Sequence, residues 1–306
     1  MGLTAIPASS AANVTALRAI QDAAMPSPSP LLRLRIFQIR ALASLLNALG
    51  KRSAGRNLIN HLQSNRVTRA PLDMCLGFRR TFPSFTAAQA CASQYIQAGH
   101  EHPDEIRFHA ASSDTVRESD YPVLFYLAPL APELGRVFDL GGNVGNLFYA
   151  YQHKIKFPPT LLWTVYDLPV KKPLGEKLAA DRAERRIRFV STLAEASGSD
   201  VFIASGSLHY FEEPLHEILA PLESPPKHVF INRTPCSIGP TVITVQDNRS
   251  YLVPCKLHSR TVLLTGMQSL GYELQAEWPV YERRLPVPTH PDLCAHTYSG
   301  FYFRKK

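Results

Sequence analysis

The chain has 306 residues, 45% of them hydrophobic, so it is long enough for one or two domains with a full core. Its formal net charge is +8, and no run of 18 apolar residues occurs, which argues against a membrane-spanning helix. The five cysteines are an odd number without a Cys-x-x-Cys pair, and the chain begins without signal-peptide features. The sequence therefore predicts neither a disulfide framework nor a metal site. It predicts a reducing, cytoplasmic compartment.

The positive charge is concentrated near the N-terminus. Residues 1–80 hold 11 of the 33 Lys and Arg and only two acids, which leaves 22 basic and 23 acidic residues after them. Residues 1–30, rich in Ala, Ser, Thr and Pro, predict a flexible leader, and residues 31–49 an amphipathic helix. A basic amphipathic helix can lie on an anionic membrane, so 31–56 is a candidate for peripheral membrane contact. It can equally cap the main domain, pair with a partner helix or be a solvated face. The basic residues lack interleaved aromatics, which argues against a specific nucleic-acid partner.

The next segment is expected to be mainly helical. Thr86–Ala98 has a helical pattern, with Ser84 or Thr86 as its N-cap. We therefore expect a helical N-terminal region at 31–120 and a main domain at 121–306.

From the main domain onward, strand and helix patterns alternate. The expected helices are Tyr121–Ala131, Asn146–Lys154, Pro173–Arg185, Pro214–Leu222 and Thr261–Leu270. The expected strands are Arg136–Leu140, Leu161–Tyr166, Ile187–Val190, Asp200–Ala204, His228–Asn232, Tyr272–Glu277 and Thr297–Arg304. This alternation predicts an α/β fold of the Rossmann-like, doubly wound type, with a mostly parallel seven-stranded sheet and helices on both faces.

A glycine-rich turn follows the first of these strands. Its glycines, Gly141, Gly142 and Gly145, permit a tight turn and let a ligand approach the backbone at the edge where open α/β sheets bind ligands. In a dinucleotide site the first glycine directly follows the strand, whereas here Asp139 stands at the strand end. A carboxylate there would repel a pyrophosphate and suit a cation such as the ammonium of methionine. This charge favours S-adenosylmethionine over NAD or FAD.

A second acid, Asp167, ends the following strand. A carboxylate at this position can accept hydrogen bonds from both ribose hydroxyls, with Leu168 beside it. The alternative is that Asp167 only begins a turn before Pro169.

These motifs resemble those of class I S-adenosylmethionine-dependent methyltransferases. The segment Asp139–Asn146 resembles their first motif, with Asn143 where glycine is usual, and Asp167-Leu168-Pro169 resembles a motif of plant-type O-methyltransferases. From about residue 76 onward, the chain is most similar to a family of uncharacterised bacterial methyltransferase-like proteins, some found with surface-polysaccharide genes. The residues that support this similarity are Tyr121–Phe125, Asp139–Gly142, Trp163, Asp167–Pro169, Ala204–Gly206, Asn232–Pro235 and Thr244–Gln246. The resemblance implies that Asp139, Gly141, Gly142, Asn143, Gly145, Asp167, Leu168, Ser205 and Gly206 bind the cofactor.

Three residues are candidates for the acceptor side. His209 follows the fourth strand and can take a proton near neutrality, and a histidine in a comparable segment is the base in plant-type O-methyltransferases. The alternative is that His209 lines the adenine or packs against a helix without a chemical role. Arg233 ends the fifth strand, where it can bind an anionic group of the substrate or form a structural ion pair. Gln246 lies in the long, polar loop 233–258, which we expect to form a lid over the acceptor.

The sequence thus predicts O-methylation of a small molecule or of a saccharide or glycolipid precursor. The alternatives are a catalytically inactive Rossmann-like protein that docks on a membrane through its basic N-terminus, and a nucleotide-dependent oxidoreductase. The sequence leaves the oligomeric state open.

Overall fold

The computed structural model describes residues 52–65, 81–93, 114–247, 252–285 and 295–306, with single positions between 34 and 72. The chain divides into Met1–Leu45 and Leu46–Lys306, and the description below concerns the second unit. The leader expected at 1–30 lies outside the described residues, and the described positions between 34 and 49 are helical, as expected. No described helix has the length and apolarity that crossing a membrane requires.

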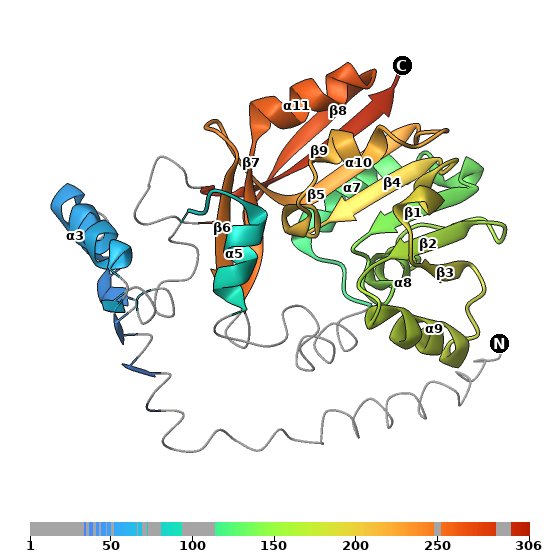
Figure 1. The fold of residues 1–306 in the computed structure, drawn as a ribbon. Coiled ribbons are helices and arrows are strands. Elements are labelled where there is room, and N and C mark those ends of the chain that lie inside the picture. The colour runs from blue at the N-terminus through green and yellow to red at the C-terminus, as the bar shows by residue number, and fades with distance from the viewer. Residues whose placement is uncertain are drawn as a thin grey trace, which may run out of the picture. The chain divides into compact units, whose positions relative to one another are not determined.

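One nine-stranded sheet forms the centre of this unit (Figure 1). Its strands are β1 (Arg136–Leu140), β2 (Leu162–Tyr166), β3 (Ile187–Val190), β4 (Val201–Ser205), β5 (His228–Ser237), β6 (Val242–Asp247), β7 (Leu252–Ser259), β8 (Tyr272–Val280) and β9 (Tyr298–Lys305). β3, β2, β1, β4 and β5 are parallel neighbours in that order, and the antiparallel β9 joins β5 to β8. These seven strands confirm the predicted fold class, to which β6 and β7 are added.

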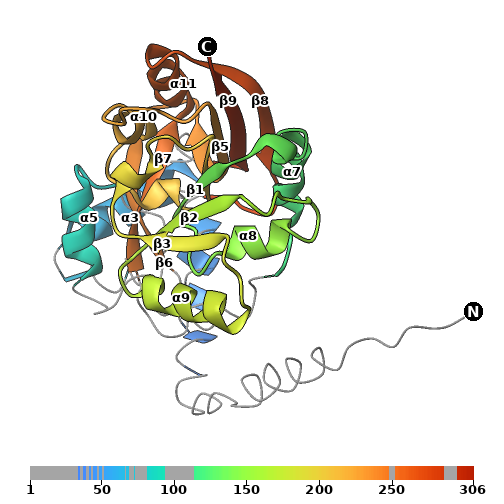
Figure 2. The ribbon, with the colours of Figure 1, turned by 90° about the vertical axis from the view of Figure 1, so that its right-hand side faces the viewer.

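Helices cover both faces of the sheet (Figure 2). The α-helices with described bounds are α3 (Ser53–Ser64), α5 (Phe85–Ala92), α7 (Tyr121–Leu127), α8 (Asn146–Tyr151), α9 (Lys171–Asp181), α10 (Leu215–Leu219) and α11 (Arg260–Ser269). Short 3-10 helices are η1 (Glu118–Asp120), η2 (Ala131–Glu133), η3 (Leu193–Ala196) and η4 (Leu208–Tyr210). The Ser84 side chain caps α5 by accepting a hydrogen bond from the Ala87 N–H at 3.1 Å, as predicted.

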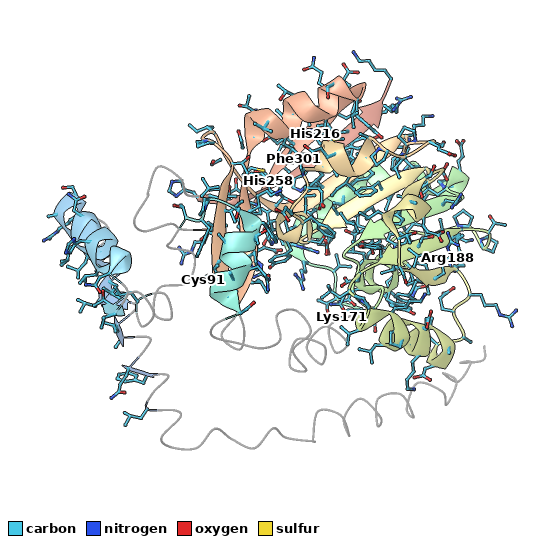
Figure 3. All side chains as sticks on the ribbon, in the orientation of Figure 1. Cys91, Lys171, Arg188, His216, His258 and Phe301 are labelled. Carbon is cyan, nitrogen blue, oxygen red and sulfur yellow. The ribbon has the colours of Figure 1, made fainter. Side chains whose placement is uncertain are left out.

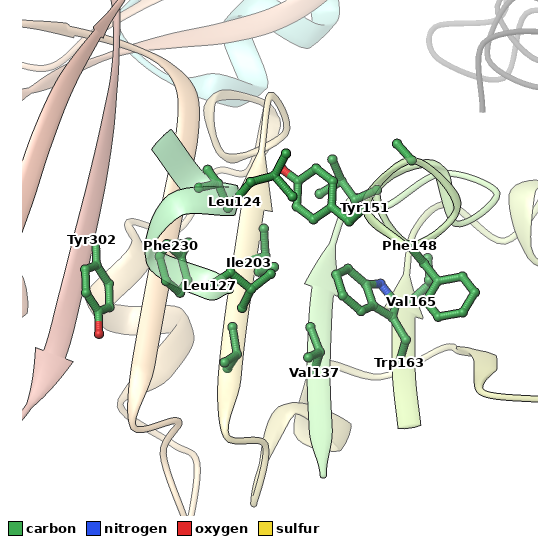
Figure 4. Packing of buried hydrophobic residues seen from close by; sticks show 14 of the residues in the cluster. Leu124, Leu127, Val137, Phe148, Tyr151, Trp163, Val165, Ile203, Phe230 and Tyr302 are labelled. Atoms are coloured by element: carbon green, nitrogen blue, oxygen red, sulfur yellow. The ribbon is translucent and has the colours of Figure 1, made fainter. Parts of the chain in front are cut away.

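Two apolar cores lie on opposite faces of the sheet because successive strand residues point to opposite sides. Val137 packs in one core with α7, α8 and α9, whereas the neighbouring Phe138 packs in the other with α10 and α11. Figure 4 shows the first core, where Leu124 and Leu127 of α7 cover side chains from the central strands. Parallel strands that are buried on both faces need nearly continuous apolar runs, and this is why the sequence located them well.

The segment 233–258 is not the lid loop that the sequence analysis expected. β5 continues to Ser237, and β6 and β7 form an antiparallel hairpin whose second strand pairs with Cys236 and Ser237 of β5. α5 packs against this hairpin (Figure 1), and Phe82 pairs with Ile243. β7 is buried from Val253 to Ser259, and Lys256 and His258 are among the buried residues. These polar residues interrupt the apolar pattern and hid the strand in the sequence.

The order of the strands determines where a ligand can bind. From β1 the chain moves outward through β2 to β3, and then returns to place β4 on the other side of β1. In open α/β sheets, ligands bind at such a switch point, beyond the carboxyl ends of the strands. The residues after Leu140 and after Ala204, which are partners in the register of β1 and β4, therefore border the candidate site.

Candidate functional site

The turn after β1 has a backbone that few residues other than glycine adopt. Gly141 and Gly145 have φ values of 68° and 92°, and a Cβ on either would lie 2.3 Å from a neighbouring side-chain carbon. Asn143 has a φ of 57°, and it stands where the methyltransferase motif that the sequence resembles has glycine. Asparagine tolerates this left-handed conformation better than most residues. The departure from the family pattern therefore preserves the shape of the turn.

Asp139 lies beneath this turn and is only 1% exposed. One carboxylate oxygen, Oδ2, accepts a hydrogen bond from the Trp163 indole at 3.1 Å, whereas Oδ1 is buried without a hydrogen-bond partner. Burial, with a smaller contribution from the nearby Asp167, raises the pKa of Asp139 to about 7 against the lowering effect of the Trp163 bond. The carboxyl is therefore partly protonated at neutral pH, and a cation placed beside it would favour its charged form.

Asp167 holds the turn from the neighbouring strand end. Its Oδ2 accepts a hydrogen bond from the Asn143 N–H at 2.7 Å, and its Oδ1 accepts one from the Leu168 N–H at 2.7 Å. A carboxylate offers about four lone-pair sites, so it can accept from several donors at once, hydroxyls among them. Asp139 and Asp167 are close enough to interact electrostatically, as expected for acids at the ends of adjacent parallel strands.

The end of β4 completes this edge. Gly206 has a φ of 78° and donates its N–H to the Asn232 carbonyl at 2.8 Å. The Ser205 hydroxyl and the Asn143 side-chain oxygen are both buried without a hydrogen-bond partner. Together with Asp139 Oδ1, three polar atoms on the predicted cofactor residues thus lack partners, a feature that native structures rarely keep without a ligand or water.

His209 lies in η4 and is 3% exposed. Its ring contacts Tyr210 at 4.1 Å and Tyr298 at 5.8 Å between centroids. The Tyr210 hydroxyl donates a hydrogen bond to Gln246 Oε1 at 2.5 Å. η4 therefore links the candidate base to Gln246 on β6, two residues that the sequence analysis assigned to the same side.

A second histidine, which the sequence analysis did not single out, lies against the same element. His258 of β7 (labelled in Figure 3) forms a hydrogen bond with the Leu208 backbone, and burial lowers its pKa to about 3. It is neutral over the physiological pH range and a weak base, so His209 remains the candidate base on η4.

Arg233 is buried in an ion pair rather than open to ligands. Its Nη1 donates to Asp120 Oδ1 at 2.7 Å, and the same oxygen receives Asn232 Nδ2 at 3.3 Å and the Tyr151 hydroxyl at 3.2 Å. Two consecutive strand residues reach one acceptor because β5 carries a bulge here, with Arg233 at a φ of 52°. The ion pair that was the alternative to substrate binding is therefore present, and substrate binding by Arg233 stays a prediction.

Asp120 was not a candidate in the sequence analysis. It lies more than one hundred positions from Arg233 along the chain. The one local signal was its place directly before the helix that begins at Tyr121, which marks a capping residue but not its partner.

Metal ligands do not gather in this site. Within the described ranges, no three His, Cys, Asp or Glu side chains are placed to hold an ion.

No protein-family model and no curated protein sequence matches the chain. Solved structures do match it. The 1,6-didemethyltoxoflavin-N1-methyltransferase of Burkholderia thailandensis, with bound S-adenosylhomocysteine, is 20% identical at a TM-score of 0.40, and the match covers 69% of this chain and 92% of that one. Magnesium protoporphyrin IX methyltransferase from Synechocystis PCC 6803, with bound S-adenosylmethionine, is 13% identical at 0.42, covering 67% and 86%. An O-methyltransferase family protein from Burkholderia thailandensis is 16% identical at 0.43, covering 69% and 64%. These are likenesses at low identity.

Proposed function

We propose that the chain is an S-adenosylmethionine-dependent methyltransferase. The observation that carries this proposal is the pair of carboxyls, Asp139 and Asp167, at the adjacent ends of β1 and β2 around a left-handed glycine turn. Two acids with mutually unfavourable charges favour a cationic ligand, and a dinucleotide phosphate would add to their repulsion.

The residues present fit this cofactor. Asp139 Oδ1, buried without a partner, can accept from the ammonium group. The Asp167 carboxylate, which already accepts from two backbone N–H groups, is the acceptor that we assign to the ribose hydroxyls. Asn143 and Ser205 provide two further polar atoms without partners at the same edge. When bound, the cofactor supplies an electrophilic methyl group on a sulfonium.

His209 is the residue that we assign to the acceptor's proton. Methyl transfer to a hydroxyl oxygen requires removal of the hydroxyl proton, and a neutral imidazole can accept it as the oxygen–carbon bond forms. η4 holds His209 after β4, on the same side as Gln246. We infer O-methylation of a small molecule or saccharide precursor from this arrangement.

Calorimetric titration tests the cofactor assignment directly. Wild-type protein should bind S-adenosylhomocysteine and not NADH. Asp167→Ala should weaken that binding by at least about tenfold, a loss of about 1.4 kcal/mol. The exposed Asp181, which pairs with Lys177 on α9, gives the matched control Asp181→Ala, which should bind like wild type. Preferential binding of NADH, or equal affinity in both variants, would refute the assignment.

The role of His209 requires a separate measurement. His209→Gln should keep cofactor affinity near the wild-type value and lose methyl transfer to an acceptor found by screening phenol, glycan and lipid pools with labelled cofactor. Retained turnover would remove His209 as the base.

A further inference from the structure

Three arginines lie near the bulge of β5. We call Arg117, Arg233 and Arg283 the arginine cluster. The segment before α7 carries Arg117, and the Asp120–Arg233 ion pair of 2.7 Å ties this segment to β5. The turn after β8 carries Arg283, and a bond of 2.5 Å from Ser119 Oγ to Glu282 Oε1 ties this turn to the same segment. These bonds hold three distant parts of the chain together, and Arg117 lies close enough to Arg233 and to the exposed Arg283 to interact electrostatically with both.

The arginine cluster borders the acceptor side of the proposed methyltransferase site. Arg233 Nη2 lies 3.4 Å from the Ser205 carbonyl, at the end of β4. The Tyr298 N–H donates to the Arg283 carbonyl at 3.1 Å, and the Tyr298 ring contacts His209. The arginine cluster is therefore connected to both the predicted cofactor edge and the candidate base.

The carboxylates nearby are already engaged. Asp120 receives Arg233, Asn232 and Tyr151 on one oxygen and the Arg117 backbone N–H on the other, and Glu282 receives Ser119. Among the residues that the structure describes, the side chains of Arg117 and Arg283 form no ion pair and no hydrogen bond. Two guanidinium groups, with five donors each, are left available.

The electrostatics agree with this geometry. Partial burial lowers the pKa of Arg117, and the like charges of Arg233 and Arg283 lower it further, only partly offset by Asp120 and Glu282. Like charges that are held together in a partly buried place are stabilised when an anion binds between them.

We propose that Arg117 and Arg283 bind an anionic group, a phosphate or a carboxylate, on the methyl acceptor. This inference rests on the proposed function, because it concerns the acceptor of that site. Guanidinium groups bind phosphate and carboxylate alike through paired N–H donors, and the experiment below distinguishes which of the two groups the acceptor carries. Arg233 holds the segment that carries Arg117 against β5 through its ion pair with Asp120.

The experiment uses the full chain saturated with S-adenosylhomocysteine. Inorganic phosphate and acetate are titrated separately at constant ionic strength, and binding is followed by calorimetry. The variants are Arg117→Gln and Arg283→Gln, each of which removes a guanidinium that has no partner to leave unpaired. Arg304→Gln is the control, because Arg304 is exposed and pairs with the opposite end of β5, at His228.

We expect wild-type protein and Arg304→Gln to bind at least one of the two anions, and each cluster variant to bind it at least about tenfold more weakly. The anion that binds identifies the source. Binding of neither anion, or equal binding by all variants, would overturn the inference. Failure of the proposed function is distinguishable, because S-adenosylhomocysteine would then not bind in the first step.

Discussion

Replacing Asp139 by asparagine tests whether the buried carboxyl has the electrostatic character that the cofactor site requires. Burial raises its pKa from 3.8 to about 7, a rise of about three units. At 1.36 kcal/mol per unit, this rise corresponds to about 4 kcal/mol of folding free energy. Because the folded state holds the proton more tightly, this stability is fully present below pH 3.8 and is lost as the pH rises to about 7. Asparagine keeps the shape and has no charge to lose.

The quantity to measure is the free energy of unfolding of wild type minus that of Asp139→Asn, from urea denaturation between pH 5 and 8. Taking the difference cancels the titration of the other carboxyls. We expect it to fall by about 3 kcal/mol over this interval, the part of the 4 kcal/mol that lies within it. Asp181→Asn, at an exposed carboxyl, should show a change below about 1 kcal/mol. A difference for Asp139→Asn that stays constant across the interval would show that the carboxyl is not buried as described.

The remaining predictions concern the glycine turn, a buried lysine and the N-terminal helix. Gly145→Ala should lower the free energy of unfolding by about 1–3 kcal/mol, because its Cβ would lie 2.3 Å from Ile187 Cδ1 at a positive φ; urea denaturation measures this, and an unchanged midpoint would contradict it. Lys171→Met should raise the free energy of unfolding by about 1–3 kcal/mol, because the Lys171 side chain (labelled in Figure 3) is buried and its Nζ has no hydrogen-bond partner among the described residues. A loss of stability in this variant would contradict that reasoning. Phe37→Glu and Leu45→Glu, at exposed helix positions, should each reduce sedimentation with phosphatidylserine vesicles if 31–56 contacts anionic membranes; equal sedimentation of wild type and variants would exclude that contact.

The sequence predicted the geometry around the glycine turn, where we propose that the cofactor binds, better than the geometry around Arg233 and Gln246. Asp139, Asn143 and Asp167 lie within one strand–helix–strand unit, where local apolar runs and glycines determine the geometry. Every strand of the parallel core was expected within one residue at its start, because burial on both faces requires a readable pattern.

The geometry around Arg233 and β6 depends on contacts that no local pattern reports. Arg233 meets Asp120 across more than one hundred positions, and whether it bonds a ligand or a carboxylate is decided by that tertiary contact. The hairpin of β6 and β7 was expected as a loop because polar residues that the tertiary structure buries, such as Thr244, Lys256 and His258, interrupt its apolar pattern. In both cases the physical cause lies in partners that are distant in the sequence.

The bulge at Asn232 and Arg233 changes the phase of β5. The one extra residue reverses the face to which each following side chain of β5 points. The side chains from Thr234 to Ser237, where β5 pairs with β7, therefore face the opposite side from the one they would face in an uninterrupted strand. Removing a single residue here would turn the far end of β5 over and separate the hairpin from its partner. The number of residues in β5 is therefore under tighter constraint than their identity. Related chains should preserve the spacing between His228 and Ser237 even where the residues between them differ.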